Sequence, residues 1–447
     1  MNLDILSKII VPKIFYILPR MFLSFLALVS CFAFSQGIHR APIILTAANL
    51  PELSGFPVGT YRVFKSKNGK AEAIPFQIDE LTRYEDFVLG QGPSPNTHEG
   101  DGIFEGLDEL SFMGEDVGDI DPIKTWAGTP PDLSFELSAI HQNGKKGAVY
   151  IGIWFSTPPP LSKRSYVYFD LKEAKILTSR YAYFFDPTNY LVVKGIDVIK
   201  DGLPKRLVDS SSFFLKADLK YFITFLVNQS SIESKLEAYK NGPIRSIVRV
   251  SFSYVLLKLN FEMGMYTEVS FFANSVILPA IMYNPLNGAK SLNKGSGFYY
   301  GFALKENPGL LKMNSTLPEY SQKRSINPFA AKPIVKESYS VTASSPDWFM
   351  QMEIQPSKKM IAKGFGPSLY VENLASQDMN SRPLNKALEL GKSPVNLAVN
   401  FDLSEFDEGE HRVGFKLFFE NNVTPEILDS FSTLRNWEYS AKRLGKP

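Results

Sequence analysis

The stretch Glu99–Asp121, EGDGIFEGLDELSFMGEDVGDID, holds nine carboxylates and no lysine or arginine. The imbalance begins earlier, because the chain from Glu85 to Asp121 contains eleven Asp or Glu, no Lys or Arg, and one histidine, His98. Carboxylates at this density repel one another within a Debye length of roughly 8 Å at physiological salt. The stretch therefore predicts either a solvated acidic hairpin or a loop that folds around a cation.

The spacing of the acidic residues indicates which cation such a loop would bind. A calcium loop of the EF-hand type needs oxygen ligands at alternating positions, a glycine at the sixth position and a carboxylate at the twelfth. With Gly102 as the sixth residue, the predicted Ca²⁺ ligands are Glu99, Asp101, the Ile103 carbonyl, Glu105 and Asp108. Thr97 stands where Asp is expected, and strands rather than helices are predicted around the loop. A solvated hairpin and a catalytic carboxylate pair therefore stay open as alternatives.

Outward from this stretch, the chain has the pattern of antiparallel strands. Apolar and polar residues alternate over 248–256, 350–354, 397–403 and 413–419, and alternation places one face of a strand on a core and the other toward solvent. Long helices do not alternate with these runs. We therefore expect a mainly β protein built of antiparallel β-sandwich domains, a small N-terminal one and a large one.

A proline segment suggests where the two domains meet. Pro158, Pro159 and Pro160 cannot donate hydrogen bonds to a β-ladder and favour an extended connector. The predicted domains are residues 37–157, with the acidic loop, and residues 165–447, the large sandwich, with few contacts crossing between them. A C-terminal helix is expected over 425–443, because Thr424 can cap it and Pro425 suits its first position.

The N-terminal residues have the features of an export signal. Three basic residues precede the apolar run Met21–Phe34, which ends in small residues, so residues 1–35 are predicted to direct export to the periplasm, the outer membrane surface or the extracellular space. Two processing routes are open. One is plain cleavage before Gln36. The other is lipidation of Cys31 in the sequence Leu-Val-Ser-Cys, which would supply the only attachment to a membrane.

Charge and cysteine content exclude several classes of function. Residues 1–35 contain three of the 48 basic and one of the 46 acidic residues, so the remaining chain carries 45 of each. A neutral chain without a basic cluster gives no electrostatic footprint for nucleic acid. Cys31 is the only cysteine, which excludes disulfides and cysteine chemistry in the exported chain.

Two motifs suggest a family. Ile74-Pro-Phe-Gln-Ile-Asp-Glu80 followed by the segment Gly100–Met113, GDGIFEGLDELSFM, resembles a module of secreted bacterial proteins of unknown function. The resemblance covers roughly residues 40 to 155. In the second half, the segment Lys240-Asn-Gly-Pro-Ile-Arg245 and the residues after it resemble a turn followed by a strand. This turn and strand are found in large sandwich proteins of the galactose-mutarotase type, which act on or bind glycans. This second resemblance implies a sandwich fold and does not transfer a mechanism.

Motifs of known catalytic sites are absent from the sequence, which has no G-x-S-x-G, G-x-G-x-x-G, P-loop or H-E-x-x-H. His411 is the one histidine of the second domain, and we expect it at the surface near a turn. The aromatic residues around Tyr166–Phe185 are expected to pack in the core, with a sugar-binding platform as the alternative.

The function that we expect is therefore an exported, envelope-associated binding protein for a glycan or a protein partner. A carbohydrate-active enzyme, lyase or hydrolase, on a mutarotase-like sandwich is the alternative. The two functions can be distinguished by one feature of the structure. An active site requires a groove in which Arg, Tyr and two carboxylates lie within about 10 Å of one another.

Overall fold

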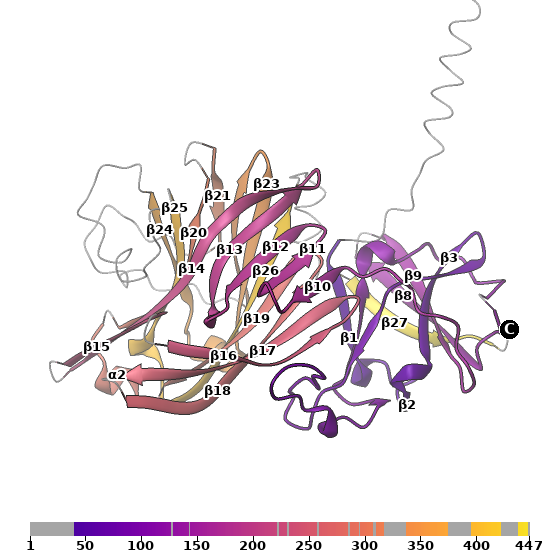
Figure 1. The fold of residues 1–447 in the computed structure, drawn as a ribbon, viewed down its shortest axis with the longest axis horizontal. Coiled ribbons are helices and arrows are strands. Elements are labelled where there is room, and N and C mark those ends of the chain that lie inside the picture. Colours follow the sequence, from indigo (N-terminus) through magenta and orange to yellow (C-terminus); the bar gives the residue numbers. More distant parts are fainter. Residues whose placement is uncertain are drawn as a thin grey trace, which may run out of the picture.

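The computed structural model describes residues 40–126, 128–142, 144–220, 223–229, 232–256, 259–284, 287–294, 296–306, 310–316, 337–373, 395–421 and 437–445. The protein is mainly β, and all strand pairs within its sheets are antiparallel over these residues. Two groups of sheets lie side by side, a smaller N-terminal unit and a larger sandwich unit (Figure 1). The export segment and Cys31 lie outside the described residues.

The N-terminal unit consists of a five-stranded, a three-stranded and a two-stranded sheet, ordered β27-β8-β9-β3-β4, β1-β7-β5 and β2-β6. Its strands are β1 Pro42–Thr46, β2 Phe56–Pro57, β3 Tyr61–Lys67, β4 Lys70–Ala73, β5 Gln77–Asp79, β6 Ile103–Phe104, β7 Glu109–Met113, β8 Leu133–His141, β9 Lys146–Ile153 and β27 Trp437–Arg443. Short 3₁₀ turns η1 Ala47–Asn49, η2 Val58–Thr60, η3 Thr97–Glu99 and η4 Gly114–Asp116 connect them. Buried side chains between the sheets form the core of this unit.

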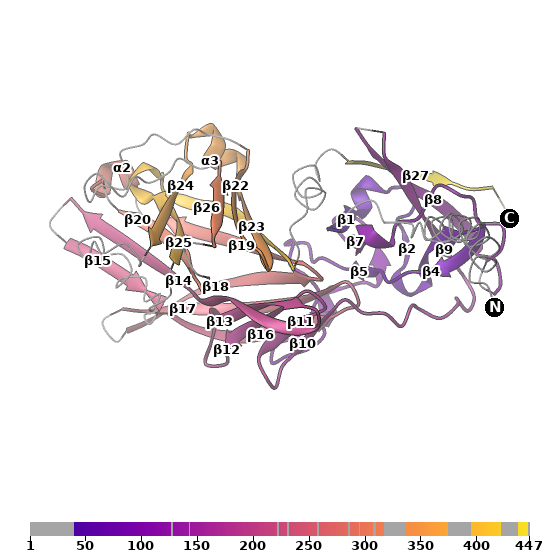
Figure 2. The ribbon, with the colours of Figure 1, turned by 90° about the horizontal axis from the view of Figure 1, so that it is seen from above.

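The sandwich unit packs a nine-stranded sheet on an eight-stranded one. The first has the order β10-β11-β12-β13-β14-β20-β25-β24, with β15 on β14, and the second has the order β16-β17-β18-β19-β26-β23-β22-β21. Figure 2 shows the sandwich unit and the N-terminal unit from above. A single buried cluster draws residues from both sheets, from Val167 to Phe419.

The bounds of the sandwich strands follow. They are β10 Val167–Asp170, β11 Lys175–Thr178, β12 Tyr181–Asp186, β13 Asn189–Lys200, β14 Leu203–Leu219, β15 Ile223–Asn228, β16 Ile232–Asn241, β17 Arg245–Leu256, β18 Leu259–Phe272, β19 Ser275–Asn284, β20 Gly297–Leu304, β21 Lys312–Ser315, β22 Tyr339–Ser345, β23 Trp348–Pro356, β24 Pro367–Asn373, β25 Val395–Asp402 and β26 Gly409–Glu420. The helical elements are α2 Gly288–Ser291, α3 Lys358–Ala362 and the 3₁₀ turn η7 Leu403–Glu405. None of the described helices is long and apolar enough to cross a bilayer.

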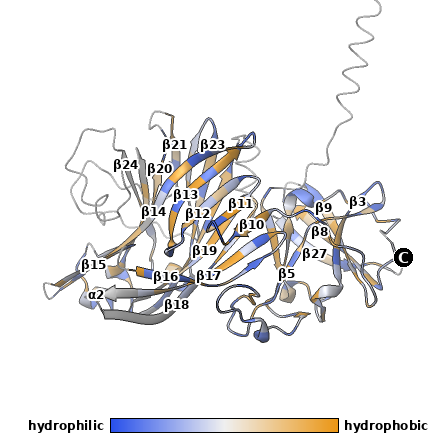
Figure 3. Cartoon of the chain, viewed as in Figure 1, coloured by the Kyte–Doolittle hydropathy of each residue, from blue (hydrophilic) through white to orange (hydrophobic). Residues whose placement is uncertain are grey.

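The alternation of apolar and polar residues explains these strands. On β23 and β26 every second side chain is buried in the sandwich core, as the sequence pattern predicts. Figure 3 shows hydrophobic and hydrophilic residues alternating along the strands of the sandwich. The aromatic residues Tyr181, Tyr183 and Phe185 point inward and are buried, which confirms core packing for most of that stretch, while Tyr168 is exposed.

The same alternation corrects the expectation for His411. We expected this residue at the surface near a turn, but it is fully buried on β26, on the same face as Val413 and Phe415. One ring nitrogen, Nε2, lies 2.9 Å from the carbonyl of Asp407, and the ring packs 4.6 Å from that of Phe406. The histidine is thus part of the core at this end of the sandwich.

The C-terminal residues also differ from the expectation. Residues 437–443 form the strand β27 and not the end of a helix, and they pair with β8 of the N-terminal unit. The helix prediction is therefore wrong for these residues; the rest of 425–443 lies outside the described residues. The physical reason is a period of two: Trp437, Tyr439 and Ala441 pack on the core of the N-terminal unit, while Glu438 between them is exposed. The N-terminal unit therefore needs residues from both ends of the chain.

This strand generates a prediction. Trp437→Ala should lower the free energy of unfolding by about 3 kcal/mol, because the indole packs against His141 at 4.9 Å and fills the end of the core. Chemical denaturation measures the change. The matched control is Glu438→Ala on the exposed face of the same strand, which should cost less than about 0.5 kcal/mol. Equal effects of the two substitutions would contradict the strand assignment.

Candidate functional site at the junction of the two units

The two units meet at Arg245, the first residue of β17, whose side chain reaches into the N-terminal unit. Its Nε donates to Asp79 Oδ2 at 2.7 Å, and its Nη2 lies 2.7 Å from the carboxylates of both Asp79 and Glu109. Arg245 is only 1% exposed. Asp79 comes from β5 and Glu109 from β7, two neighbouring strands of one sheet. A single guanidinium therefore joins the edge of the sandwich to two strands of the other unit.

Lysine and glutamine side chains complete this contact. Lys240 Nζ lies 2.6 Å from Asp79 Oδ1 and donates to the carbonyl of Ile78 at 3.0 Å. Gln77 donates to Asp79 through its amide nitrogen, at 2.8 Å, and accepts from the backbone N–H of Arg245 at 3.1 Å. Two cations therefore face two carboxylates, and the buried cluster is neutral.

Glycine allows this close approach. A Cβ at Gly242 would lie 2.0 Å from the side-chain oxygen of Gln77, far inside van der Waals contact. Only glycine at this position lets the turn before β17 come near enough for Gln77 to accept from two successive backbone N–H groups, those of Ile244 and Arg245. The missing side chain at Gly242 therefore leaves the space that the Gln77 side chain occupies beside the turn.

Burial and charge act in opposite directions on the ionisation of this cluster. Burial disfavours the charged form of Asp79, but the attraction of Arg245 and Lys240 outweighs it and holds the pKa of this carboxyl below its usual value. Burial likewise opposes the charge on Arg245, and the carboxylates of Asp79 and Glu109 raise its pKa. The rings of Phe87 and Phe272 flank the guanidinium, with centroids 4.6 Å and 5.7 Å from Cζ. The charged forms of Asp79 and Arg245 therefore stabilise one another despite their burial.

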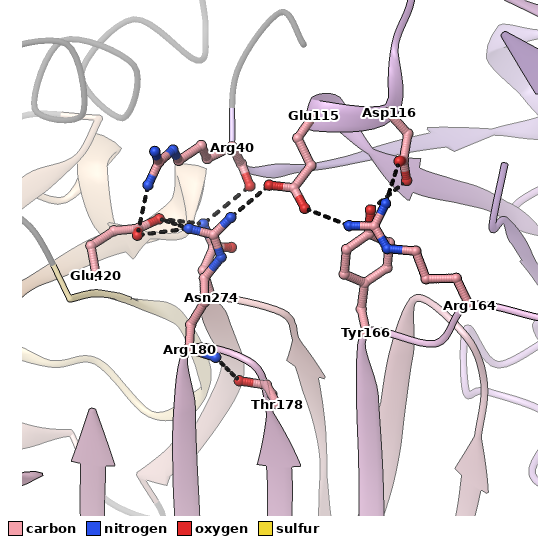
Figure 4. Close-up of polar contacts among 9 residues, drawn as sticks. All are labelled: Arg40, Glu115, Asp116, Arg164, Tyr166, Thr178, Arg180, Asn274 and Glu420. Atoms are coloured by element: carbon pink, nitrogen blue, oxygen red, sulfur yellow. Dashed lines mark hydrogen bonds and ion pairs between the residues drawn. The ribbon is translucent and has the colours of Figure 1, made fainter. Parts of the chain in front are cut away.

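A second network joins the units around Glu420, at the end of β26 (Figure 4). Arg180 Nη1 donates to Glu420 at 2.8 Å, and its Nη2 donates to Glu115 of the N-terminal unit at 2.6 Å. Arg40, just before β1, reaches the same Glu420 at 3.3 Å. Asn274 donates to Glu420 and to the carbonyl of Arg40, both at 3.1 Å. The fully buried carboxylate of Glu420 thus has partners from both units.

The connector between the units adds a third basic residue to this network. Arg164 donates to Asp116 at 3.1 Å and to Glu115 at 3.4 Å, and its guanidinium lies 4.3 Å from the centroid of the Tyr166 ring (Figure 4). The Tyr166 hydroxyl donates to Asp116 at 2.6 Å. Burial raises the pKa of Asp116 although Tyr166 and Arg164 oppose the shift. Residues on the connector therefore bind η4 of the N-terminal unit.

A third contact holds the segment 81–87 on the outer face of the sandwich. Phe87 donates its backbone N–H to Glu268 at 3.0 Å and accepts from Arg249 at 2.7 Å through its carbonyl. Arg249 and Glu268 form an ion pair at 2.6 Å, so a charged pair binds both backbone groups of one residue. Few contacts were expected between the domains. The three contacts together show that this expectation is wrong, because the acidic residues of the first unit pair with basic residues of the second.

The predicted calcium ligands have other partners in the structure. Asp108 accepts from the backbone N–H of Leu81 at 2.8 Å and of Glu105 at 2.9 Å. Asp101 accepts from the N–H of Ile103 at 2.8 Å, and Glu99 accepts from the side chain of Asn96 at 2.8 Å. The side chain of Glu105 is exposed. Three of the four predicted side-chain ligands therefore accept hydrogen bonds within the loop.

The loop does not form a ready-made ligand sphere. Among the described residues, no three His, Cys, Asp or Glu side chains are grouped in a way that could hold a metal ion. The pKa of Asp108 is raised, first by burial and then by the charges of Glu80 and Asp101, so negative charge does gather at this end of the loop. Calcium binding by these residues stays a prediction.

Sequence reasoning found the two motifs that build the junction but not their contact. The Gln77 and Asp79 side chains belong to the first motif, Glu109 to its second half, and Lys240 and Arg245 to the motif before β17. Gln77 and Arg245 are 168 residues apart, which no local pattern bridges. The sequence feature that indicated such a contact is the absence of basic residues between Glu85 and Asp121, because carboxylates without local partners need cations from elsewhere in the chain or from solution.

Comparisons with known proteins add little to this geometry. No protein-family model and no curated protein sequence matches the chain. Two solved structures from Enterococcus faecalis are similar over 92% of the chain, each at 8% sequence identity: an alpha-mannosidase from strain V583, with a TM-score of 0.44, and a protein in glycosyl hydrolase family 38, with a TM-score of 0.40. The chain covers 45% and 46% of these proteins. Similarity this low carries no argument about function.

The buried cluster generates the second prediction. Asp79→Asn should lower the free energy of unfolding by roughly 3–5 kcal/mol at pH 7, because it leaves Lys240 and Arg245 with one carboxylate between them. The pKa of Asp79 is lowered in the folded protein, so its stabilisation is present above its unfolded pKa of about 4 and is lost as pH falls through the folded value. The difference between parent and variant should therefore shrink below about pH 4.

Denaturant unfolding at several pH values measures this difference. The control is Glu72→Gln, which removes a partly exposed ion pair with Lys65 at 3.3 Å and should cost less than about 1 kcal/mol. If Asp79→Asn were as mild as Glu72→Gln, the buried cluster would not stabilise the protein.

The acidic loop generates the third prediction. In the presence of chelator, Asp108→Asn should lower the free energy of unfolding by about 1.5–3 kcal/mol, because two backbone N–H groups lose a charged acceptor. Asp101→Asn, which affects one exposed hydrogen bond, should cost less. Thermal melting of both variants and the parent in millimolar calcium and in chelator tests whether a cation contributes. A larger loss for Asp108→Asn in calcium than in chelator would indicate a bound ion, and an equal loss would assign the effect to hydrogen bonds alone.

Proposed function

We propose that the protein is an exported binding protein of the β-sandwich type, which recognises a glycan or a protein partner outside the cytoplasmic membrane. The observation that carries this proposal is the junction, where acidic residues of the first unit pair with basic residues of the second. Asp79 and Glu109 pair with Arg245, and Glu115 pairs with Arg180. Carboxylates held in this way stabilise the contact between the units, as a scaffold requires.

Sequence features support the export part of the proposal. Residues 1–35 have a basic start and an apolar run, and the chain after them carries equal numbers of acidic and basic residues. A neutral exported chain is suited to uncharged ligands or protein partners and gives no footprint for nucleic acid. Attachment to a membrane would require lipidation of Cys31.

The experiment has two arms. Cell fractionation with mass determination of the N-terminus tests export, and we expect the chain to begin at Gln36 or at a lipidated Cys31 in an envelope or extracellular fraction. Full-length protein in the cytosol would contradict export. The exported protein is then applied to a glycan array and, separately, cross-linked in intact cell envelopes.

We expect specific retention on glycans or capture of one envelope protein, without release of shortened sugar. Product analysis on every retained glycan separates binding from catalysis. Cleaved or eliminated sugar would replace the binding proposal by the alternative, a carbohydrate-active lyase or hydrolase. The absence of both retention and capture would contradict the binding function itself.

A further inference from the structure

A surface beside the junction has the features of a ligand site. The segment 81–87 forms a tight turn whose ends, Leu81 and Phe87, are bridged as in a hairpin. Inside the turn, Thr82 donates its backbone N–H to the carbonyl of Asp86 at 2.7 Å, and its hydroxyl accepts from the N–H of Tyr84 at 3.1 Å. Thr82 itself is buried. The tip of the turn therefore has a defined conformation.

The tip presents an aromatic ring to solvent. Tyr84 is 65% exposed, more than any other tyrosine whose side-chain exposure the structure describes. Arg83 lies over its ring, with Cζ 4.7 Å from the centroid, and donates to its hydroxyl at 2.6 Å. The next residue, Glu85, has a φ of 69°, a left-handed conformation that is costly for a residue with a side chain. The ring and the two charged groups are therefore held together at the tip.

A second ring lies on the outer face of the sandwich sheet close to this turn. Tyr266 on β18 is 37% exposed, and its hydroxyl donates to Asp86. Arg249 lies 5.5 Å from the centroid of this ring and also binds the carbonyl of Phe87 at 2.7 Å. The two units thus contribute one exposed tyrosine each to a common surface.

Strand β26 supplies a further charged pair to this surface. Arg412 alternates with the inward-facing His411 and Val413, so its side chain points outward, where it pairs with Glu410 and is mostly exposed. The hydrogen bond that Arg412 donates to Glu410 raises the pKa of Arg412, and the charges of Glu410, Glu85 and Asp86 add to the shift. In the same sheet, only β19 separates β26 from β18, the strand that carries Tyr266, and Arg412 is paired with Ile281 of β19.

The chemistry of this surface selects a class of ligand. Two exposed tyrosine rings offer apolar faces with polar rims, and such rings are enriched at binding surfaces. The exposed guanidinium groups of Arg83 and Arg412 can donate hydrogen bonds to the hydroxyl groups of a ligand. The carboxylates of Glu85, Asp86 and Glu410 can accept hydrogen bonds from them. Because the carboxylates outnumber the exposed guanidinium groups, this surface disfavours an anionic ligand.

We propose that Tyr84, Tyr266, Asp86 and Arg412 form a binding site for a neutral oligosaccharide at the junction of the two units. This inference rests on the proposed binding function and assigns it a place and a ligand class. The Arg249–Glu268 pair positions the turn by holding the backbone of Phe87, so the site exists only where the units are in contact.

Glycan-array binding of the full exported chain tests the proposal, with neutral hexose oligosaccharides and with sulfated and uronic-acid oligosaccharides as probes. We expect retention on neutral probes, and Tyr84→Ala should weaken it by about tenfold or more without changing the melting temperature, since this ring is exposed. Tyr266→Phe keeps the ring but removes the hydrogen bond to Asp86, and we expect a smaller loss. The matched control is Tyr168→Ala, which removes a tyrosine that is 56% exposed on the other sheet and should leave retention unchanged.

Each other outcome overturns the inference in a distinguishable way. Retention on neutral probes that Tyr84→Ala and Tyr266→Phe leave unchanged would keep the binding function and refute this site. Preference for sulfated or uronic-acid probes would refute the ligand class. No retention on any glycan, together with capture of an envelope protein by cross-linking, would refute the oligosaccharide site and leave a protein-binding function.

Discussion

The separation of acidic and basic residues between the two units is the constraint on which the rest of the structure depends. Residues 85–121 of the first unit contain eleven acidic residues and no lysine or arginine, so these carboxylates repel one another unless cations from elsewhere approach them. The second unit and its connector supply Arg164, Arg180 and Arg245. The charges of Glu109, Glu115 and Asp116 are thus balanced by arginines from outside the acidic segment.

Burial makes this contact specific. A buried ion pair contributes less to stability than its Coulomb energy suggests, because both groups lose their hydration. Its effect is large when one partner is missing, since an uncompensated charge then stays in the interior. Arg245 faces Asp79 and Glu109 in one arrangement only, and Gly242 must lie against Gln77 for the strands to come so close. Other placements of the units would leave these charges unpaired.

The same contact explains why a surface suited to ligands lies at the junction. Glu268 and Arg249 bind both backbone groups of Phe87 and thereby fix the turn that carries Tyr84. A loop on one unit is held against a sheet of the other, and the exposed groups of both lie together. The strand β27 adds a second link between the units, because it leaves the sandwich and completes the sheet of the N-terminal unit.

Local patterns in the sequence determined the strands. The period of two predicted most of β17, β23, β25 and β26, because alternation of apolar and polar residues is a property of each strand alone. The same period is present around His411 and in residues 437–443, where the structure has a buried residue and a strand. The sequence also marked the residues of the junction, since the two motifs with Asp79 and Arg245 stood out.

Only the tertiary structure decided what those residues do. The carboxylates could have bound calcium, remained solvated or formed a catalytic pair. The sequence could not choose between cations from solution and arginines elsewhere in the chain, which lie 48 residues away for Arg164 and Asp116 and 166 for Arg245 and Asp79. Asp79 and Arg245 come together because the packed sheets of the two units place β5 and the start of β17 next to one another. Which charges meet therefore depends on the packing of whole sheets, and that packing is a long-range property of the chain.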